Sequence, residues 1–117
     1  MNALTAGLGP GERIRRRADF QQVYGQGVRI HGRYSTIFVL PNRHGVARLG
    51  IAATKKLGGA VWRNRAKRLI REVFRRNKIV TGLDIVVVPR RELFEASLIA
   101  LEADYRSTLE RRHGRRR

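Results

Sequence analysis

The chain contains no cysteine, which excludes a disulfide framework, a cysteine-bound zinc site and a thiol nucleophile. No apolar run approaches the roughly 18 residues that mark a membrane-spanning helix. The N-terminal residues also lack the charged and apolar regions of a secretory signal. We therefore expect a cytoplasmic protein that has no membrane partner.

Acidic residues are scarce. Nine Asp plus Glu stand against 26 Lys plus Arg, so the net charge is +17 in 117 residues. An excess of this size points to a polyanionic partner and away from enzymes of small neutral metabolites. The length suits one domain with a modest core. Because 42% of the residues are hydrophobic, we expect that domain to fold.

The positive charge is concentrated in three segments: residues 13–17, residues 55–78 and the C-terminal tail. Residues 55–78 alone hold ten Lys or Arg and one acid, whereas residues 84–110 carry a net charge of −3. This uneven distribution indicates a binding face. Arginine outnumbers lysine by 22 to 4, which suits forked contacts to phosphate, although a codon bias would give the same ratio.

The residue pattern predicts an α+β fold. We expect a flexible N-terminal arm (residues 1–12), a single domain (13–112) and a basic tail (113–117). The predicted elements are a helix over 18–24, strands over 34–40 and 46–53, a helix over 61–77, a strand over 85–88 and helical structure over 92–112.

Three details of this prediction concern the connections. The short segment between strands 34–40 and 46–53 favours an antiparallel hairpin. Gly25 and Gly27 are expected to end the first helix, and Ser97 is a candidate cap that would divide the last helical segment. The second strand, the helix over 61–77 and strand 85–88 form a crossover unit, which general rules expect to be right-handed.

The helix over 61–77 is the most informative element. One side carries a stripe typical of a core-facing helix: Trp62, Ala66, Leu69, Ile70, Val73 and Phe74. Six or seven cations spread over the opposite side with one acid, Glu72, whereas a solvated face usually alternates charge signs. Because these cations repel one another, we predict that the helix binds a polyanion.

Two other features each allow two interpretations. Thr54, Lys55 and Lys56 precede a pair of glycines and a helix start, which suits either phosphate binding or a plain loop. Phe20, Tyr24 and Phe38 are either core residues or a platform on which bases stack.

Catalysis by side chains finds little support. His31, His44 and His113 are not spaced as metal ligands, and the chain has no carboxylate cluster of the kind that a metal-dependent nuclease needs. We therefore predict a nucleic-acid-binding protein with no catalytic residue of its own.

Residues 63–72, which read Arg-Asn-Arg-Ala-Lys-Arg-Leu-Ile-Arg-Glu, closely resemble the protein subunit of bacterial ribonuclease P. The similarity extends upstream through residues 54–61 and also covers residues 15–24 and 84–88. It spans roughly residues 13–110, nearly the whole domain.

The resemblance implies a small α/β sandwich with a four-stranded sheet, the element order αβββαβα and a left-handed βαβ crossover. It implies binding of the ribonuclease P catalytic RNA and of the 5′ leader of precursor tRNA, which assists endonucleolytic removal of that leader. The RNA carries out hydrolysis with Mg²⁺ in the holoenzyme, so no cofactor is expected on the protein alone.

The resemblance also implies the site residues. Leader RNA would be bound by Phe20, Tyr24, Phe38, Arg15, Arg16 and Arg17. Further RNA contacts would come from Lys55, Lys56, Arg63, Asn64, Arg65, Lys67, Arg68, Arg71 and Arg75.

The alternative interpretation is a small ribosomal or RNA-chaperone protein, which composition alone does not separate from this family. The Arg-Asn-Arg run together with Phe20 and Tyr24 favours the ribonuclease P protein. A DNA-binding protein ranks lower, because the sequence has no recognition-helix pattern and no dimerisation heptad. No obligate protein partner is evident.

Overall fold

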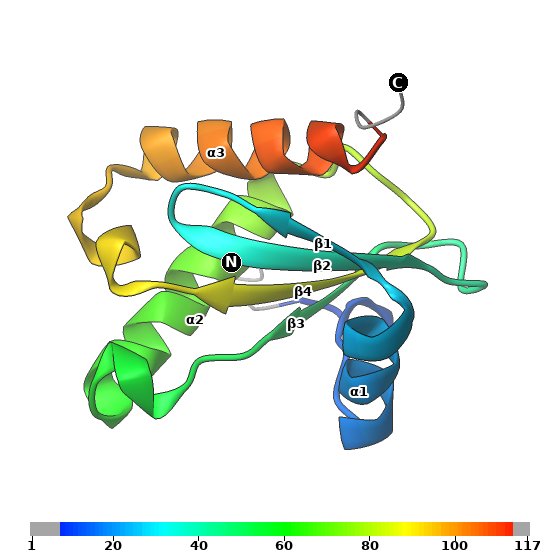
Figure 1. The fold of residues 1–117 in the computed structure, drawn as a ribbon, viewed down its shortest axis with the longest axis horizontal. Helices are drawn as coiled ribbons and strands as arrows, with labels where there is room; N and C mark the ends of the chain where they lie inside the picture. Colours follow the sequence, from blue (N-terminus) through cyan, green and yellow to red (C-terminus); the bar gives the residue numbers. More distant parts are fainter. Residues whose placement is uncertain (1–7, 114–117) are drawn as a thin grey trace.

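The computed structural model describes residues 8–113, which form four strands and three helices (Figure 1). The strands make one sheet, and helices cover both of its faces. In chain order the elements are α1 (Arg17–Gln26), β1 (Val28–His31), β2 (Ser35–Pro41), β3 (Arg48–Ile51), α2 (Ala60–Arg76), β4 (Leu83–Pro89) and α3 (Leu98–Glu110). Short 3-10 turns occupy Pro10–Glu12, Lys55–Leu57, Arg91–Glu95 and Arg111–His113. The predicted α+β class and the αβββαβα order are confirmed.

The sheet has the order β1-β2-β4-β3, in which β2 is antiparallel to β1 and β4, and β3 is parallel to β4. The predicted hairpin between strands 34–40 and 46–53 is therefore wrong, because β4 lies between β2 and β3. Asp84, Ile85, Val86 and Val87 of β4 are all buried. A strand in the middle of a sheet is covered on both faces. Pairing of β2 with β3 in a hairpin would instead place β4 at an edge of the sheet.

The crossover from β3 through α2 to β4 connects two neighbouring parallel strands. Its left-handed sense stays a prediction. Strand β1 was not identified from the residue pattern, since four residues are too few to show an alternation, but the family order requires a strand there.

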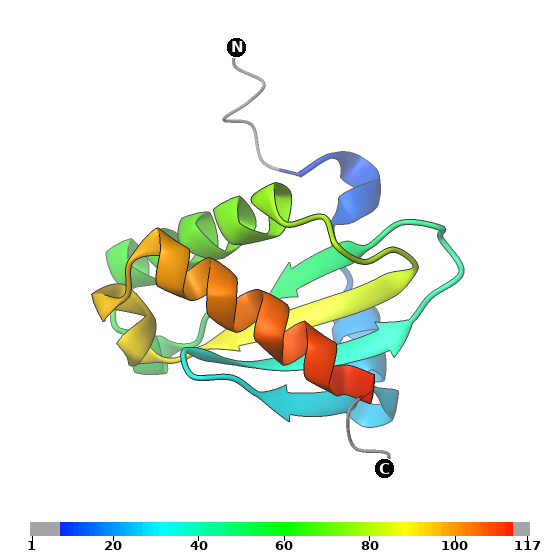
Figure 2. The ribbon, with the colours of Figure 1, turned by 90° about the horizontal axis from the view of Figure 1, so that it is seen from above.

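The main core lies between the sheet and helices α2 and α3, which cover the same face (Figure 2). Side chains from β2 and β4 that point to this face alternate with side chains that point to the other. On the opposite face, α1 packs Val23 against Val86 of β4, with Ile14 beside them. Helix α1 contacts β2 and β4, and this face carries the smaller of the two hydrophobic clusters.

Helix α2 confirms most of the predicted core stripe: Ala66, Ile70, Val73 and Phe74 are buried, and Leu69 is partly buried. Trp62 is the exception. Its side chain is 48% exposed and packs on Phe94, at 4.9 Å between ring centroids, because it lies beyond the end of the sheet.

The ends of α1 and α3 follow local signals. Gly25 lies inside α1, contrary to prediction, and Gly27 ends the helix. A Cβ atom at Gly27 would lie 2.5 Å from the carbonyl oxygen of Val23, so only glycine fits there. The predicted division at Ser97 is confirmed, because its Oγ accepts a hydrogen bond from the N–H of Ala100 at 3.1 Å and begins α3.

Residues 8–12, which belong to the predicted flexible arm (1–12), contact the domain, and the arm itself stays a prediction. Leu8 is buried, and Glu12 accepts a hydrogen bond from Lys78 after α2. Residues 1–7 and 114–117, which hold the rest of the predicted arm and most of the basic tail, lie outside the described residues. Within residues 8–113, no helix is long and apolar enough to cross a membrane.

A buried ion pair fixes the start of β4 to β3. Arg48 donates two hydrogen bonds to Asp84, Nε to Oδ1 at 2.8 Å and Nη2 to Oδ2 at 2.7 Å, and Asn42 donates a third at 2.8 Å. Burial alone would raise the pKa of Asp84, but the hydrogen bonds from Arg48 and Asn42 outweigh it and hold this pKa below its usual value.

We expect Asp84→Ala to lower the free energy of unfolding by about 3 to 5 kcal/mol at neutral pH, because the largely buried Arg48 would lose both hydrogen bonds to a carboxylate and keep the more distant Asp19, at 3.9 Å. A carboxylate with a lowered pKa stabilises the fold above its unfolded-state pKa of about 4, and this contribution is lost as the pH falls through the folded-state pKa. Urea unfolding at about pH 7 and about pH 3 would measure both effects.

The matched control is Glu110→Ala, which removes an exposed carboxylate from α3 and should change stability by less than about 0.5 kcal/mol. A loss for Asp84→Ala that stays the same at both pH values would contradict the role of the ion pair.

Candidate nucleic-acid interface

Three aromatic rings form a continuous row on the α1 side of the sheet. Phe20 and Tyr24 lie one turn apart on α1, with ring centroids 6.4 Å apart, and Phe38 of β2 meets Tyr24 edge to face at 5.0 Å. Phe20 and Phe38 are partly buried, and Tyr24 is 40% exposed. The rings therefore pack on one another and leave Tyr24 open to solvent, and stacking of bases on them stays a prediction.

Gly50 of β3 gives Phe20 its place in this row. A Cβ atom at position 50 would lie 2.7 Å from Cζ of Phe20 and 3.1 Å from Cβ of Ile14. The absent side chain thus leaves room for the ring against the strand. A glycine inside a strand signals such a close approach, but it was not used in predicting the site.

Arg29 is a candidate contact that sequence reasoning missed. It lies directly opposite Phe38 in the pairing of β1 with β2, so both side chains are on the same face of the sheet. Its guanidinium is exposed. The signal was hidden because β1 itself was not recognised from the residue pattern.

The N-terminal arginines are held beside this row by the edge of the sheet. Arg13 pairs with Leu49 in an isolated parallel bridge, and the N–H of Ile14 donates to the carbonyl oxygen of Leu49 at 3.0 Å. Ile14 is buried and anchors the segment. Arg15, Arg16 and Arg17 follow it, are all exposed, and lead directly into α1.

A basic pocket of about 390 Å³ joins these arginines to α2. Its walls carry Arg13, Arg15, Lys67 and Arg71, and Phe20 lies at one side. No acidic residue lines it. Burial, together with repulsion from Arg13 and Arg68, lowers the pKa of the Arg71 guanidinium. An anion bound in the basic pocket would reduce this repulsion.

Within residues 8–113, two buried arginine nitrogens also lack an acceptor. The Nε atoms of Arg13 and Arg63 are buried and have no hydrogen-bond partner in the described part of the chain. A buried donor without an acceptor is costly, and a phosphate oxygen would satisfy it.

The remaining predicted residues of α2 fall into two groups. Asn64, Arg65 and Arg68 are exposed. Arg75, in contrast, donates two hydrogen bonds to Glu72 at 2.7 and 2.8 Å. These hydrogen bonds lower the pKa of Glu72, although burial alone would raise it. Part of the predicted repulsion along α2 is therefore relieved within the helix, because Glu72 lies within ion-pair distance of both Arg75 and Arg76.

Lys55 and Lys56 lie in a 3-10 turn ahead of α2, and both are exposed. Oγ1 of Thr54 accepts a hydrogen bond from the N–H of Lys56 at 3.3 Å and caps this turn. Gly58 follows with φ of +121°, a conformation that favours glycine. The structure does not bring Lys55 or Lys56 to the basic pocket, and phosphate binding at this turn stays a prediction.

The residues considered for chemistry have structural partners. Asp84 is paired with Arg48, Asp19 lies 3.9 Å from the same arginine, and Nδ1 of His31 is 3.1 Å from Oγ1 of Thr36. Within residues 8–113, no three His, Asp or Glu side chains are grouped so that they could hold a metal ion. The arrangement suits binding and orientation of a nucleic acid.

Comparisons with known proteins agree with this geometry. Residues 8–113 match the family model described as Ribonuclease P. The Ribonuclease P protein component of Thermotoga maritima is 43% identical over 86 residues, which cover 72% of this chain and 74% of that protein. The one from Clostridioides difficile is 34% identical over 101 residues, 84% of this chain and 89% of that protein.

Solved structures show the same fold. The ribonuclease P protein from Thermotoga maritima superposes with a TM-score of 0.77 at 36% identity, covering 86% of this chain and 96% of that one. The Staphylococcus aureus ribonuclease P protein gives a TM-score of 0.74 at 34% identity, covering 85% and 93%.

We expect Arg68→Ala to weaken binding of a folded RNA and to reduce the slope of log K against log salt concentration by about one unit, because one phosphate contact is lost. Fluorescence anisotropy at several salt concentrations would measure the slope. Arg43→Ala, which removes the same charge from the exposed turn between β2 and β3, should leave the slope unchanged. Equal changes in both variants would show that only net charge matters.

Proposed function

The chain belongs to the ribonuclease P protein family and is the protein component of this tRNA-processing endoribonuclease, and from that premise we propose that two of its surfaces bind two different RNA molecules. The aromatic row on the α1 side would hold the 5′ leader of precursor tRNA. The cations of α2 would hold the catalytic RNA. The row Phe20–Tyr24–Phe38, continuous and open beside arginines, is the observation that carries this proposal.

The aromatic row suits a strand of variable sequence. Leaders differ from one tRNA to the next, so their site has to bind without reading base edges. Stacking on an aromatic ring provides about 1–3 kcal/mol per base for any base. Arg29 beside Phe38, and Arg15, Arg16 and Arg17 at the start of α1, lie where they can neutralise the phosphates of such a strand.

Helix α2 suits a folded RNA. Its buried stripe packs on the sheet, so the cations on its outer side project from a rigid support at fixed spacings. The basic pocket connects this helix to Arg13 and Arg15. The surface for the catalytic RNA and the surface for the leader are therefore neighbours at the edge of β3.

We further propose that the Mg²⁺ of the holoenzyme is held by RNA. The described residues do not fit a metal site of three protein ligands. The contribution of this chain is then to bind the leader, position it beside the catalytic RNA and reduce the repulsion between the two RNA molecules.

Tyr24→Ala tests the leader surface. We expect the affinity for precursor tRNA with a leader to fall about 10-fold, because one base loses its stacking partner. The affinity for mature tRNA, which has no leader, should change little. Binding of both RNAs to the reconstituted holoenzyme would be measured.

Tyr24→Phe is the matched control, because it keeps the ring and should keep the preference for precursor tRNA. An equal loss of affinity for precursor and mature tRNA in Tyr24→Ala would place Tyr24 in the fold and not in the leader site.

A further inference from the structure

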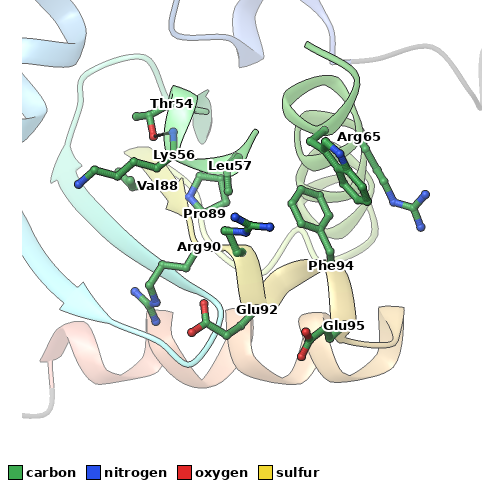
Figure 3. A pocket seen from close by; sticks show the side chains of 12 residues that line it. Thr54, Lys56, Leu57, Arg65, Val88, Pro89, Arg90, Glu92, Phe94 and Glu95 are labelled. Atoms are coloured by element: carbon green, nitrogen blue, oxygen red, sulfur yellow. Dashed lines mark hydrogen bonds between the residues drawn. The ribbon is translucent and has the colours of Figure 1, made fainter. Parts of the chain in front are cut away.

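A second, larger pocket lies at the N-terminal end of α2, whereas the basic pocket contacts the middle of that helix. Its volume is about 1010 Å³, and it is enclosed by the Lys55–Leu57 turn, the first turns of α2, the end of β4 and the Arg91–Glu95 turn (Figure 3). Of the residues predicted for the site, only Lys56 and Arg65 line it. Trp62, Arg91 and Phe94 also line it and have no role in the proposed leader and catalytic-RNA surfaces.

Trp62 is held in a fixed position and is nevertheless exposed. Phe94 meets it edge to face at 4.9 Å, and a Cβ atom at Gly58 would lie 3.0 Å from its Cδ1. The indole is thus confined between the Gly58 loop and Phe94, while 48% of the side chain remains open to solvent. A rigid, exposed indole provides a flat surface on which another ring can stack.

Three cations line the same pocket and have no internal partner in the described part of the chain. Lys56, Arg65 and Arg91 are exposed, and in the part of the chain that the structure describes their side chains make no hydrogen bond or ion pair. Arg90 differs, because it donates to Oγ1 of Thr36 at 2.9 Å and to the carbonyl oxygen of Gly32. Arg90 therefore serves the fold, and the other three cations are available to an anion.

Two carboxylates complete the pocket. Glu92 and Glu95 lie on its α3 side, whereas Lys56 and Arg65 come from the other walls (Figure 3). A ligand for this pocket therefore needs a flat ring for Trp62, an anionic group for the cations and hydrogen-bond donors for the carboxylates. A nucleotide of adenine, guanine or cytosine has all three: a base, a phosphate and an exocyclic amino group.

We propose that this pocket binds an unpaired nucleotide, with its base stacked on Trp62 and its phosphate held by Arg91. The nucleotide has to be unpaired because a base within a duplex has no free face. The inference rests on the proposed function only in taking RNA as the source, which is either the catalytic RNA or the precursor tRNA. It adds Trp62, Arg91 and Phe94 to the RNA-binding residues.

The chain provides its own reporter, because Trp62 is its only tryptophan. Tryptophan fluorescence of the full chain would be titrated with adenosine 5′-monophosphate and, separately, with inorganic phosphate. We expect saturable quenching by the nucleotide and none by phosphate, which has no ring to stack. Absence of saturable quenching, or equal quenching by phosphate, would overturn the proposal.

Arg91→Gln should raise the half-saturating concentration of the nucleotide about 10-fold, because a charged hydrogen bond to the phosphate is lost. Both this side chain and that of the control, Arg43→Gln, are exposed, so neither change should affect folding. The control should leave the titration unchanged. Equal titrations for the two variants would contradict the proposal.

Two further titrations separate this proposal from the leader surface and identify the source of the nucleotide. In the Tyr24→Ala variant, the nucleotide should quench Trp62 fluorescence as it does in the unmodified chain. A failure of the leader site would therefore not alter the result. Catalytic RNA and precursor tRNA would then be added separately, each with anisotropy recorded in parallel. Quenching by one of them identifies the source. If both RNAs bind by anisotropy and neither quenches Trp62, RNA binding stands and the pocket is not part of it.

Discussion

Burial of β4 on both of its faces is the constraint on which the rest of the structure depends. Ile85 and Val87 point into the core formed with α2 and α3, whereas Val86 packs against α1. Because β4 occupies the centre of the sheet, α2 and α1 are fixed on opposite faces. The cations of α2 and the aromatic row of α1 are thereby placed on separate surfaces that meet only at the edge of β3, in the basic pocket.

Repulsion between cations is the second constraint. Glu72 offsets part of it near the end of α2, but Arg71 lies close to Arg13 and Arg68, and its lowered pKa reflects both its burial and their charge. The hydrophobic core supplies the stability that keeps these charges together in the absence of a partner. A polyanion that neutralises them gains affinity from the release of counterions, so RNA binding and salt concentration are linked.

The sequence predicted those parts of the fold that local pattern determines. Strand Leu83–Pro89, helix α2 and the cap at Ser97 follow from apolar runs, periodicity and a side-chain hydrogen bond. The pairing of β2 and β3 with β4 could not be predicted from local pattern, since pairing depends on which strand most needs burial. Trp62 was assigned to the core because helical periodicity does not show where the sheet ends.

The site was predicted to a similar extent. The resemblance and the charge pattern indicated Phe20, Tyr24, Phe38 and the cations of α2, and the structure brings the three rings together. Arg29 and Arg91 could not be found, because their positions depend on strand register and on a pocket between distant segments.

The central claim is that this chain assists an RNA catalyst, and reconstitution tests it most directly. A bacterial ribonuclease P RNA would be assayed for cleavage of precursor tRNA at limiting Mg²⁺, alone and with the chain, beside the chain alone. We expect the chain to accelerate cleavage by the RNA and to cleave nothing by itself. An unchanged rate, or cleavage by the chain without RNA, would contradict the claim.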